Sequence, residues 1–301
     1  MTPTSLQIQT TRGGNVLGGL VRTMRPRQWV KNVLVLAAPF AGGTIFHPPV
    51  LLEVGIAFVA FSLAASGVYL INDVQDVEAD RAHPIKRHRP IAAGVVPPRL
   101  ALVVAVVLFI AAIGMSFLAS TGLVLVTAVY IAAQLSYCWW LKHQPVLDIS
   151  IVASGFLLRA IAGGAAAGIA LSQWFLLTTA FGSLFMVAGK RYAEIRLAER
   201  TGAKIRKSLD RYTASYLRFV WTLSATVVIM TYGLWAFELN RATHSHWPVI
   251  SLVPFVVAVL RYAVDVDGGN GGEPEEIALG DRVLQVLAGA LIVTLVAAVY
   301  L

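Results

Sequence analysis

Three aspartates stand directly after a long apolar run, at Asp73, Asp76 and Asp80, and Asn72 precedes them. In a helix that continues through this segment, positions i, i+3 and i+7 share one face. Three carboxylates on one face repel each other, so the cluster is unfavourable unless a cation lies among them. Oxygen ligands select a hard ion, and Mg²⁺ typically also contacts the phosphate oxygens of a substrate. The alternative is a solvated helix end whose acids pair with nearby arginines.

A basic segment follows at once and contains Lys86, Arg87 and Arg89. Arginine binds phosphate oxygens through paired hydrogen bonds, and lysine binds them as a point charge. By itself, such a run also marks the cytosolic side of a membrane protein and contacts anionic lipid. Directly after three aspartates, it favours a magnesium–diphosphate site.

Two further basic segments suit an anionic substrate. Near the N-terminus, Arg27 and Lys31 are spaced i, i+4 and share one face of a helix. The segment 189–196 combines three basic residues with a tyrosine and a single acid: Lys190, Arg191, Arg196, Tyr192 and Glu194. Charge-assisted hydrogen bonds from this segment would offset the charge of a donor that carries more phosphate than one diphosphate.

The elements that position these residues are apolar helices. Hydrophobic residues make up 57% of the chain and charged residues 13%, whereas soluble domains carry about 45–50% and about 25%. This composition excludes an ordinary soluble domain. A spanning helix needs about 20 mostly apolar residues. The sequence therefore predicts an all-α membrane protein with nine spans: 29–46, 51–71, 99–118, 121–141, 148–170, 173–189, 216–238, 248–264 and 282–301.

The basic residues fix the expected orientation of these spans. Of the 24 Lys and Arg residues, only Arg241 falls in a loop on the side opposite the N-terminus. Positively charged short loops stay cytoplasmic, so the N-terminus is predicted to be cytosolic. The net charge of +8 thus reflects topology and an anionic substrate, and we expect no nucleic-acid partner.

The domain organisation expected from this pattern is simple. Residues 1–24 are polar, lack the apolar core of a signal peptide and are predicted to form a cytosolic tail. Residues 25–301 are predicted to form one transmembrane catalytic domain. Its long cytosolic loops lie near 72–98, 190–215 and 265–281, and long loops on one face often carry function.

Arg159 lies about 11 residues into the predicted fifth span, where an arginine is costly without a partner. Asp148 starts that span and lies about 16 Å away along a straight helix, which is too far for a direct pair. Arg159 therefore either bonds groups on neighbouring helices or lines a lipid-side cavity, and we favour the structural role.

The acidic segment resembles a known family. Asn72-Asp73-x-x-Asp76-x-x-x-Asp80, followed by a basic stretch that contains proline, is similar to the first acidic motif of the UbiA-type membrane prenyltransferase superfamily. That family has nine helices with this motif after the second. The resemblance implies a UbiA-like bundle with its active site at the cytosolic face. It also implies that the three aspartates are catalytic and, with Asn72, hold Mg²⁺ against a diphosphate.

Members that prenylate aromatic rings have a second acidic motif where this chain has the basic segment 189–196. Together with residues 25–32 and 271–282, that segment resembles the branch that makes decaprenyl-phosphoryl phosphoribose for cell-wall arabinan. The resemblance implies transfer of 5-phosphoribose from 5-phosphoribosyl 1-diphosphate to decaprenyl phosphate, in a bacterial plasma membrane. The residues expected to bind substrate are Arg27, Lys31, Asn72, Lys86, Arg87, Arg89, Lys190, Arg191, Tyr192, Glu194 and Arg196.

Two other functions remain open from the sequence. One is a prenyltransferase that moves a polyprenyl chain from its diphosphate to an aromatic acceptor, using the same aspartates. The other is a carrier or flippase for a lipid phosphate, which would explain Arg159 but not an acidic motif confined to one side. Membrane enzymes are often oligomers, so a homo-oligomer is also open, although no segment of the sequence marks an interface.

Overall fold

The computed structural model describes residues 15–202, 209–268, 277 and 280–300. Within these ranges the secondary structure is entirely helical and contains no strand. The α-helices are α1 Val16–Met24, α2 Ala37–Ala41, α3 Pro48–Gln75, α4 Val77–Ala82, α5 Pro98–Phe117, α6 Thr121–Trp139, α7 Leu147–Ala166, α8 Gln173–Thr201, α9 Ala214–Thr243, α10 Trp247–Ile250, α11 Leu252–Asp267 and α13 Arg282–Tyr300. The 3₁₀ helices are η1 Pro26–Leu36, η2 Lys86–His88 and η3 Leu141–His143.

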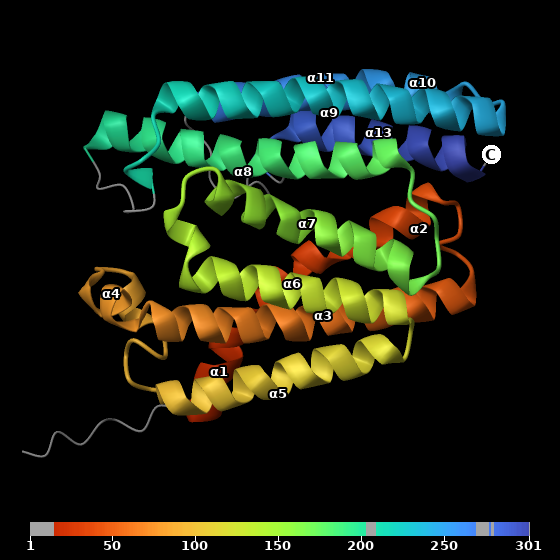
Figure 1. Cartoon of the computed structure of the whole chain (residues 1–301). Helices are drawn as coiled ribbons and strands as arrows, with labels where there is room; N and C mark the ends of the chain where they lie inside the picture. The colour runs from red at the N-terminus through yellow and green to blue at the C-terminus, as the bar shows by residue number, and fades with distance from the viewer. Residues whose placement is uncertain (1–14, 203–208, 269–276, 278–279, 301) are drawn as a thin grey trace, which may run out of the picture.

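The long helices run side by side in alternating directions (Figure 1). The C-terminal ends of α3 and α8 lie at the same end of the bundle as the N-terminal ends of α5, α7 and α9. Helices α3 and α8 therefore end on the same side of the bundle. This arrangement brings the acidic segment and the basic segment of the sequence to the same end of the molecule.

Seven helices in the described ranges are long and apolar enough to cross a membrane: Pro48–Gln75, Pro98–Phe117, Thr121–Trp139, Leu147–Ala166, Ala214–Thr243, Trp247–Asp267 and Arg282–Tyr300. Their outward faces are apolar; for example, Ile110 and Val286 are 68% and 71% exposed. Such a surface fits a bilayer rather than water. The chain is thus a multi-pass membrane protein, and seven of the nine predicted spans have a counterpart among these helices.

The other two predicted spans take different forms. The segment 29–46 contains the 3₁₀ helix η1 and the five-residue helix α2, not one spanning helix. The segment 173–189 is the first part of α8, whose 29 residues make it about 43 Å long at 1.5 Å per residue. Its last third is charged, which lowers its average hydropathy. Nine crossings therefore remain a prediction.

Glycine lets η1 pack tightly on α7. A Cβ added to Gly163 would lie 1.8 Å from the carbonyl oxygen of Val35. Hence only a residue without a side chain fits at this crossing. The non-α geometry of η1 is supported by this close backbone contact.

The predicted tail contains a helix in its second half. Asn15 caps α1 by accepting a hydrogen bond from the N–H of Gly18, at 3.2 Å. Gly19 is buried, and a Cβ there would lie 2.7 Å from Val96. The helix from Val16 to Met24 is therefore packed on the protein, whereas residues 1–14 lie outside the described ranges.

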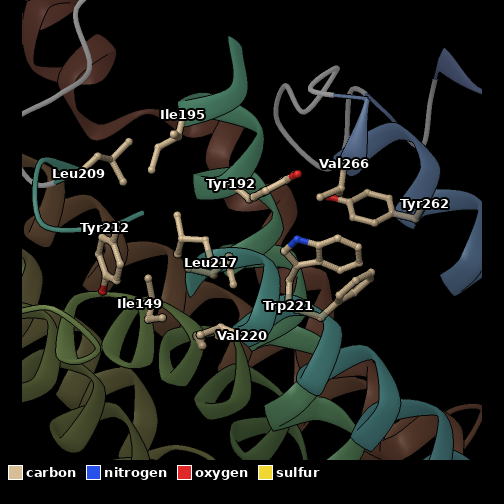
Figure 2. Packing of buried hydrophobic residues seen from close by; sticks show 14 of the residues in the cluster. Ile149, Tyr192, Ile195, Leu209, Tyr212, Leu217, Val220, Trp221, Tyr262 and Val266 are labelled. Carbon is tan, nitrogen blue, oxygen red and sulfur yellow. The ribbon is translucent and has the colours of Figure 1, made fainter. Parts of the chain in front are cut away.

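The basic segment after Gly189 is helical rather than a loop. Helix α8 continues to Thr201 and ends at Gly202, whose φ of 68° is the left-handed conformation that glycine favours at a helix end. Buried residues on this part of α8, including Tyr192 and Ile195, belong to a core cluster. Figure 2 shows them beside Trp221, Leu217 and Tyr212. The predicted loop 190–215 is thus shorter, because Lys190, Arg191, Arg196 and Arg200 lie on a packed helix.

Candidate active site

The first group of charged side chains is centred on Asp73, at the C-terminal end of α3. Its side chain is only 2% exposed. One oxygen, Oδ1, accepts hydrogen bonds from Arg25 Nη2 at 2.6 Å and Arg89 Nη1 at 3.2 Å. The same Arg89 nitrogen donates to Asp80 Oδ2 at 2.7 Å. A single guanidinium nitrogen therefore bridges two buried carboxylates.

The second group is centred on Asp76, which is more open, with 31% of its side chain exposed. Lys142 Nζ donates to Asp76 Oδ1 at 2.6 Å, and Asn72 Nδ2 donates to Oδ2 at 3.2 Å. Lys142 comes from η3, between α6 and α7. The acidic motif is thus neutralised from two directions, by Arg25 and Arg89 on one side and by Lys142 on the other.

The three aspartates lie close together but do not share one helical face. Helix α3 ends at Gln75, and Asp76 joins it to α4. The sequence expectation of one continuous helix is therefore wrong at Asp76. The backbone turn there directs Asp76 to Lys142, while Asp73 and Asp80 converge on Arg89. In the described ranges no three Asp, Glu, His or Cys side chains form a ready metal-binding group.

The donor set nevertheless fits a divalent metal. Asp73 and Asp80 have oxygens near enough for one cationic nitrogen to contact both. Carboxylate and amide oxygens are the ligands that Mg²⁺ prefers. Buried carboxylates also require compensating positive charge, because ionised groups are costly to desolvate. Asp73 and Asp80 are the pair that would hold the ion, and the contributions expected of Asp76 and Asn72 stay predictions.

The basic run after α4 contributes one residue to this group. Arg89 reaches Asp73 and Asp80, whereas Arg87 is exposed and its Nε lies 3.4 Å from His88 Nε2. Lys86 lies half-buried in η2. Lys86 and Arg87 therefore lie in the connection that follows the carboxylates, and their contacts with substrate stay predictions.

Arg27 and Lys31 lie in η1, which changes their expected relationship. A 3₁₀ helix has three residues per turn, so positions i and i+4 do not lie on one face. The shared face predicted for these two residues is therefore wrong. Their neighbour Arg25, in a left-handed backbone conformation with φ 54°, reaches Asp73.

The basic part of α8 has two kinds of environment. Arg191 is 7% exposed, and its Nη2 lies 3.8 Å from Asp148 Oδ2 at the start of α7. Arg196 instead pairs with Glu199 at 3.0 Å near the surface. Lys190 and Glu194 are half-buried on the same helix. The structure thus holds Arg191 firmly and leaves Arg196 near solvent.

Tyr192 is fully buried among the core side chains of Figure 2. Its hydroxyl donates to Asp267 Oδ1 at 2.9 Å and accepts from Arg218 Nη2 at 2.5 Å. These bonds join α8 to α9 and α11. In this conformation Tyr192 holds α8 against α9 and α11. Its direct contact with substrate stays a prediction.

The last predicted cytosolic loop is described only near its end. Arg261 Nε donates to Asp281 Oδ2 at 2.6 Å, and Asp281 Oδ1 caps α13 by accepting from the N–H of Val283 at 2.7 Å. The hydrogen bond from Arg261 holds the pKa of Asp281 below its usual range. Residues 271–276, 278 and 279 of the motif lie outside the described ranges.

Arg159 is buried away from both groups, and its contacts are with neutral acceptors. It donates to Asn32 Oδ1 at 2.7 Å, to the Gly155 carbonyl at 2.5 Å and to Tyr130 Oη at 3.2 Å. These partners lie on η1, α7 and α6. The contacts favour the structural interpretation, because one guanidinium ties three elements together.

Sequence reasoning did not assign Arg25, Lys142 or Asp148 to the site. Arg25 stood within a noted segment, but its contact with Asp73 depends on how α1 and η1 pack. Lys142 is the one lysine in the short connection between α6 and α7, and this position beside the acidic motif was the available signal. Asp148 showed no signal beyond its place at the start of a predicted span.

Comparison with known proteins gives consistent results. The sequence profile of the UbiA prenyltransferase family matches residues 33–299. A protein of Mycolicibacterium smegmatis named decaprenyl-phosphate phosphoribosyltransferase is 59% identical over 313 residues, covering 99% of this chain and 98% of the relative. A protein of the same name from Mycobacterium tuberculosis is 62% identical over 299 residues, covering 98% of this chain and 99% of the relative.

The fold also matches solved structures. A UbiA homolog from Archaeoglobus fulgidus, bound to DMAPP and Mg²⁺, aligns with a TM-score of 0.72 over 93% of this chain and 99% of that chain. The two sequences are 14% identical, so this likeness shows a shared fold alone. The described helices therefore have the arrangement of that bundle.

Proposed function

The chain belongs to the UbiA prenyltransferase family, and we propose that it transfers 5-phosphoribose from 5-phosphoribosyl 1-diphosphate to decaprenyl phosphate, releasing diphosphate. The observation that carries the proposal is the pairing of buried carboxylates with basic side chains at one end of an apolar bundle. The two relatives described above, which carry this activity in their names, match nearly the whole chain. The product would serve as a precursor for cell-wall arabinan.

The acidic and basic residues gather at the end of the bundle where α3 and α8 end, which we call the charged end. These residues suit this chemistry. In the reaction the bond from ribose C1 to diphosphate breaks, and a bond from C1 to a phosphate oxygen of the lipid forms. Mg²⁺, when bound, supplies positive charge that stabilises the departing diphosphate. Arg89 contacts Asp73 and Asp80, Lys142 contacts Asp76, and both basic residues would bind diphosphate oxygens by charge-assisted hydrogen bonds. The lipid phosphate is already ionised at neutral pH, so no general base is required.

The basic part of α8 suits a donor that carries more than one phosphate group. Lys190 and Arg191 add positive charge at the end of the bundle where α3 also ends, which suits a donor with a 5-phosphate and a diphosphate. The acceptor chain would lie along the apolar surface of the bundle. We place the chain in a bacterial plasma membrane with this charged end in the cytosol, because the basic loops gather there.

The experiment that tests the proposal offers the purified protein both sets of substrates. One mixture contains Mg²⁺, 5-phosphoribosyl 1-diphosphate and decaprenyl phosphate; the other contains Mg²⁺, a polyprenyl diphosphate and an aromatic acceptor. We expect mass spectrometry to detect a lipid that has gained one phosphoribosyl group in the first mixture alone. A prenylated aromatic product in the second mixture, with no product in the first, would move the protein to the prenyltransferase function.

A further inference from the structure

A buried polar contact joins the connection between α6 and α7 to the segment that precedes α9. Its centre is Asp148, which is 1% exposed. The hydroxyl of Tyr212 donates to Asp148 Oδ1 and accepts a hydrogen bond from the N–H of Val146 at 2.6 Å. In Figure 2 the hydroxyl of Tyr212 points toward the helix that carries Ile149. One tyrosine thus fixes both a backbone group and a carboxylate.

The second oxygen of Asp148 is left for Arg191. Oδ2 is buried, has no hydrogen-bond partner in the structure and lies 3.8 Å from Arg191 Nη2. That distance is too long for a hydrogen bond, so the pair is held by charge. The structure shows no hydrogen bond from Arg191 to another described residue. Arg191 is therefore oriented by Asp148 while its N–H groups stay available for the oxygens of an anion.

The backbone at this point is strained, which indicates that the surroundings enforce its shape. Val146 has φ 71°, a conformation that is a genuine outlier for a β-branched residue. Such strain persists only where neighbouring contacts over-determine the backbone, and it is frequent at functional sites. The bond from its N–H to Tyr212 is one such contact.

The same segment carries Lys142, whose Nζ lies 2.6 Å from Asp76. Residues 142–148 therefore run from the acidic group to Arg191 on α8. Burial and the hydrogen bond to Asp148 raise the pKa of Tyr212 above its ordinary value, so its hydroxyl remains a neutral donor. The ring also packs in the core cluster that includes Ile149 and Leu217, which keeps the contact rigid.

We propose that Asp148 is a positioning residue: with Tyr212, it orients Arg191 and the segment 142–148 so that Arg191 and Lys142 bind the phosphate groups of one phosphorylated sugar donor. Asp148 itself does not touch the donor. This inference rests on the proposed function, since it assigns residues to the donor side of that site.

The test compares Asp148→Asn and Tyr212→Phe with wild-type protein. Both variants keep the shape of the side chain and remove the charge or the hydroxyl. We expect KM for 5-phosphoribosyl 1-diphosphate to rise at least about tenfold, as for loss of a charged hydrogen-bonding arrangement, with KM for decaprenyl phosphate unchanged. Tyr216→Phe is the matched control, because the ring of Tyr216 stacks on that of Tyr212 with centroids 5.8 Å apart, and the structure shows no hydrogen bond between the Tyr216 hydroxyl and Asp148.

A double-variant comparison separates positioning from a general structural effect. If Asp148 acts through Arg191, adding Asp148→Asn to the Arg191→Ala variant should change KM for 5-phosphoribosyl 1-diphosphate little, although Asp148→Asn alone raises it. Fully additive effects, or equal rises in KM for both substrates, would overturn the inference. The melting temperature of each variant in detergent shows whether it is folded.

Binding of inorganic diphosphate, measured by calorimetry, keeps the two proposals separable. Weaker binding in Asp148→Asn and Tyr212→Phe than in Tyr216→Phe supports the positioning role even if the wild-type protein transfers no phosphoribose, a result that would refute the proposed function alone. Unchanged diphosphate binding together with unchanged donor KM would refute the positioning role and leave the proposed function intact.

Discussion

Each aspartate of the acidic motif at the charged end forms an ion pair with a basic side chain. Asp73 and Asp80 share Arg89, and Asp76 contacts Lys142. Removing one partner of a buried pair typically costs about 3–5 kcal/mol, because an uncompensated charge is left behind. The buried carboxylates of Asp73 and Asp80 therefore support folding as well as the proposed chemistry. Variants at this end must keep the size of the side chain to separate the two effects.

Asp73→Asn is the first such variant. The amide keeps the shape but removes the negative charge that a metal–diphosphate complex requires, so we expect transfer to fall by at least about 100-fold. The melting temperature should show that the protein remains folded. Glu78→Gln is the matched control, since Glu78 is 80% exposed and pairs with Arg81 at the surface. Wild-type transfer by Asp73→Asn would remove the argument for a metal site.

Lys190→Ala tests the basic part of α8. The loss of one positive charge near the donor should raise KM for 5-phosphoribosyl 1-diphosphate about tenfold and affect KM for decaprenyl phosphate less. Steady-state kinetics with each substrate varied in turn measures both constants. Arg241→Ala, at the opposite end of α9, should leave both unchanged. An equal effect of Lys190→Ala on the two substrates would argue against donor binding by this helix.

Residue patterns predicted only part of this site. The acidic motif and Arg89 are close in sequence, so their spacing revealed them. Arg25 and Lys142 approach the same carboxylates from 48 and 66 residues away, and Asp148 meets Tyr212 across 64 residues. Such contacts depend on how helices pack, which the spacing of residues along the chain does not specify.

At the scale of elements, apolar run length located most of the spanning helices, because a bilayer imposes a minimum length on each. It did not reveal that the run 29–46 is divided into η1 and α2, nor that α8 continues past Gly189. Both features depend on tertiary packing. The helix η1 packs its backbone closely on α7, and the end of α8 packs in the core around Tyr192.

Gly163→Ala tests the contact between η1 and α7. A Cβ at this position would lie 1.8 Å from the Val35 carbonyl oxygen, and the backbone must shift to admit it. We expect a loss of about 1–3 kcal/mol in the free energy of unfolding, seen as a lower melting temperature in detergent. Gly289→Ala in α13 is the control, because nothing lies within 4 Å of its added Cβ. Equal melting temperatures for the two variants would contradict the close packing of η1.

For the whole molecule, the distribution of basic residues predicts which end faces the cytosol. Cysteine labelling tests this in a Cys138→Ser background, since Cys138 is the single native cysteine and is buried. A membrane-impermeant thiol reagent should label Glu78→Cys in inverted vesicles and Arg241→Cys in right-side-out vesicles or intact cells. The reverse pattern would place the charged end outside the cell and contradict the proposed orientation.

In the proposed reaction, the charged end of the molecule breaks the bond between ribose C1 and diphosphate and passes the sugar to a lipid phosphate. The most direct measurement gives purified protein, Mg²⁺ and decaprenyl phosphate a donor that is labelled separately in the ribose and in the diphosphate. We predict that the ribose label moves into the lipid phase, that the diphosphate label is released into water, and that EDTA stops both. Ribose label that stays in water, or diphosphate label that enters the lipid, would contradict the claim.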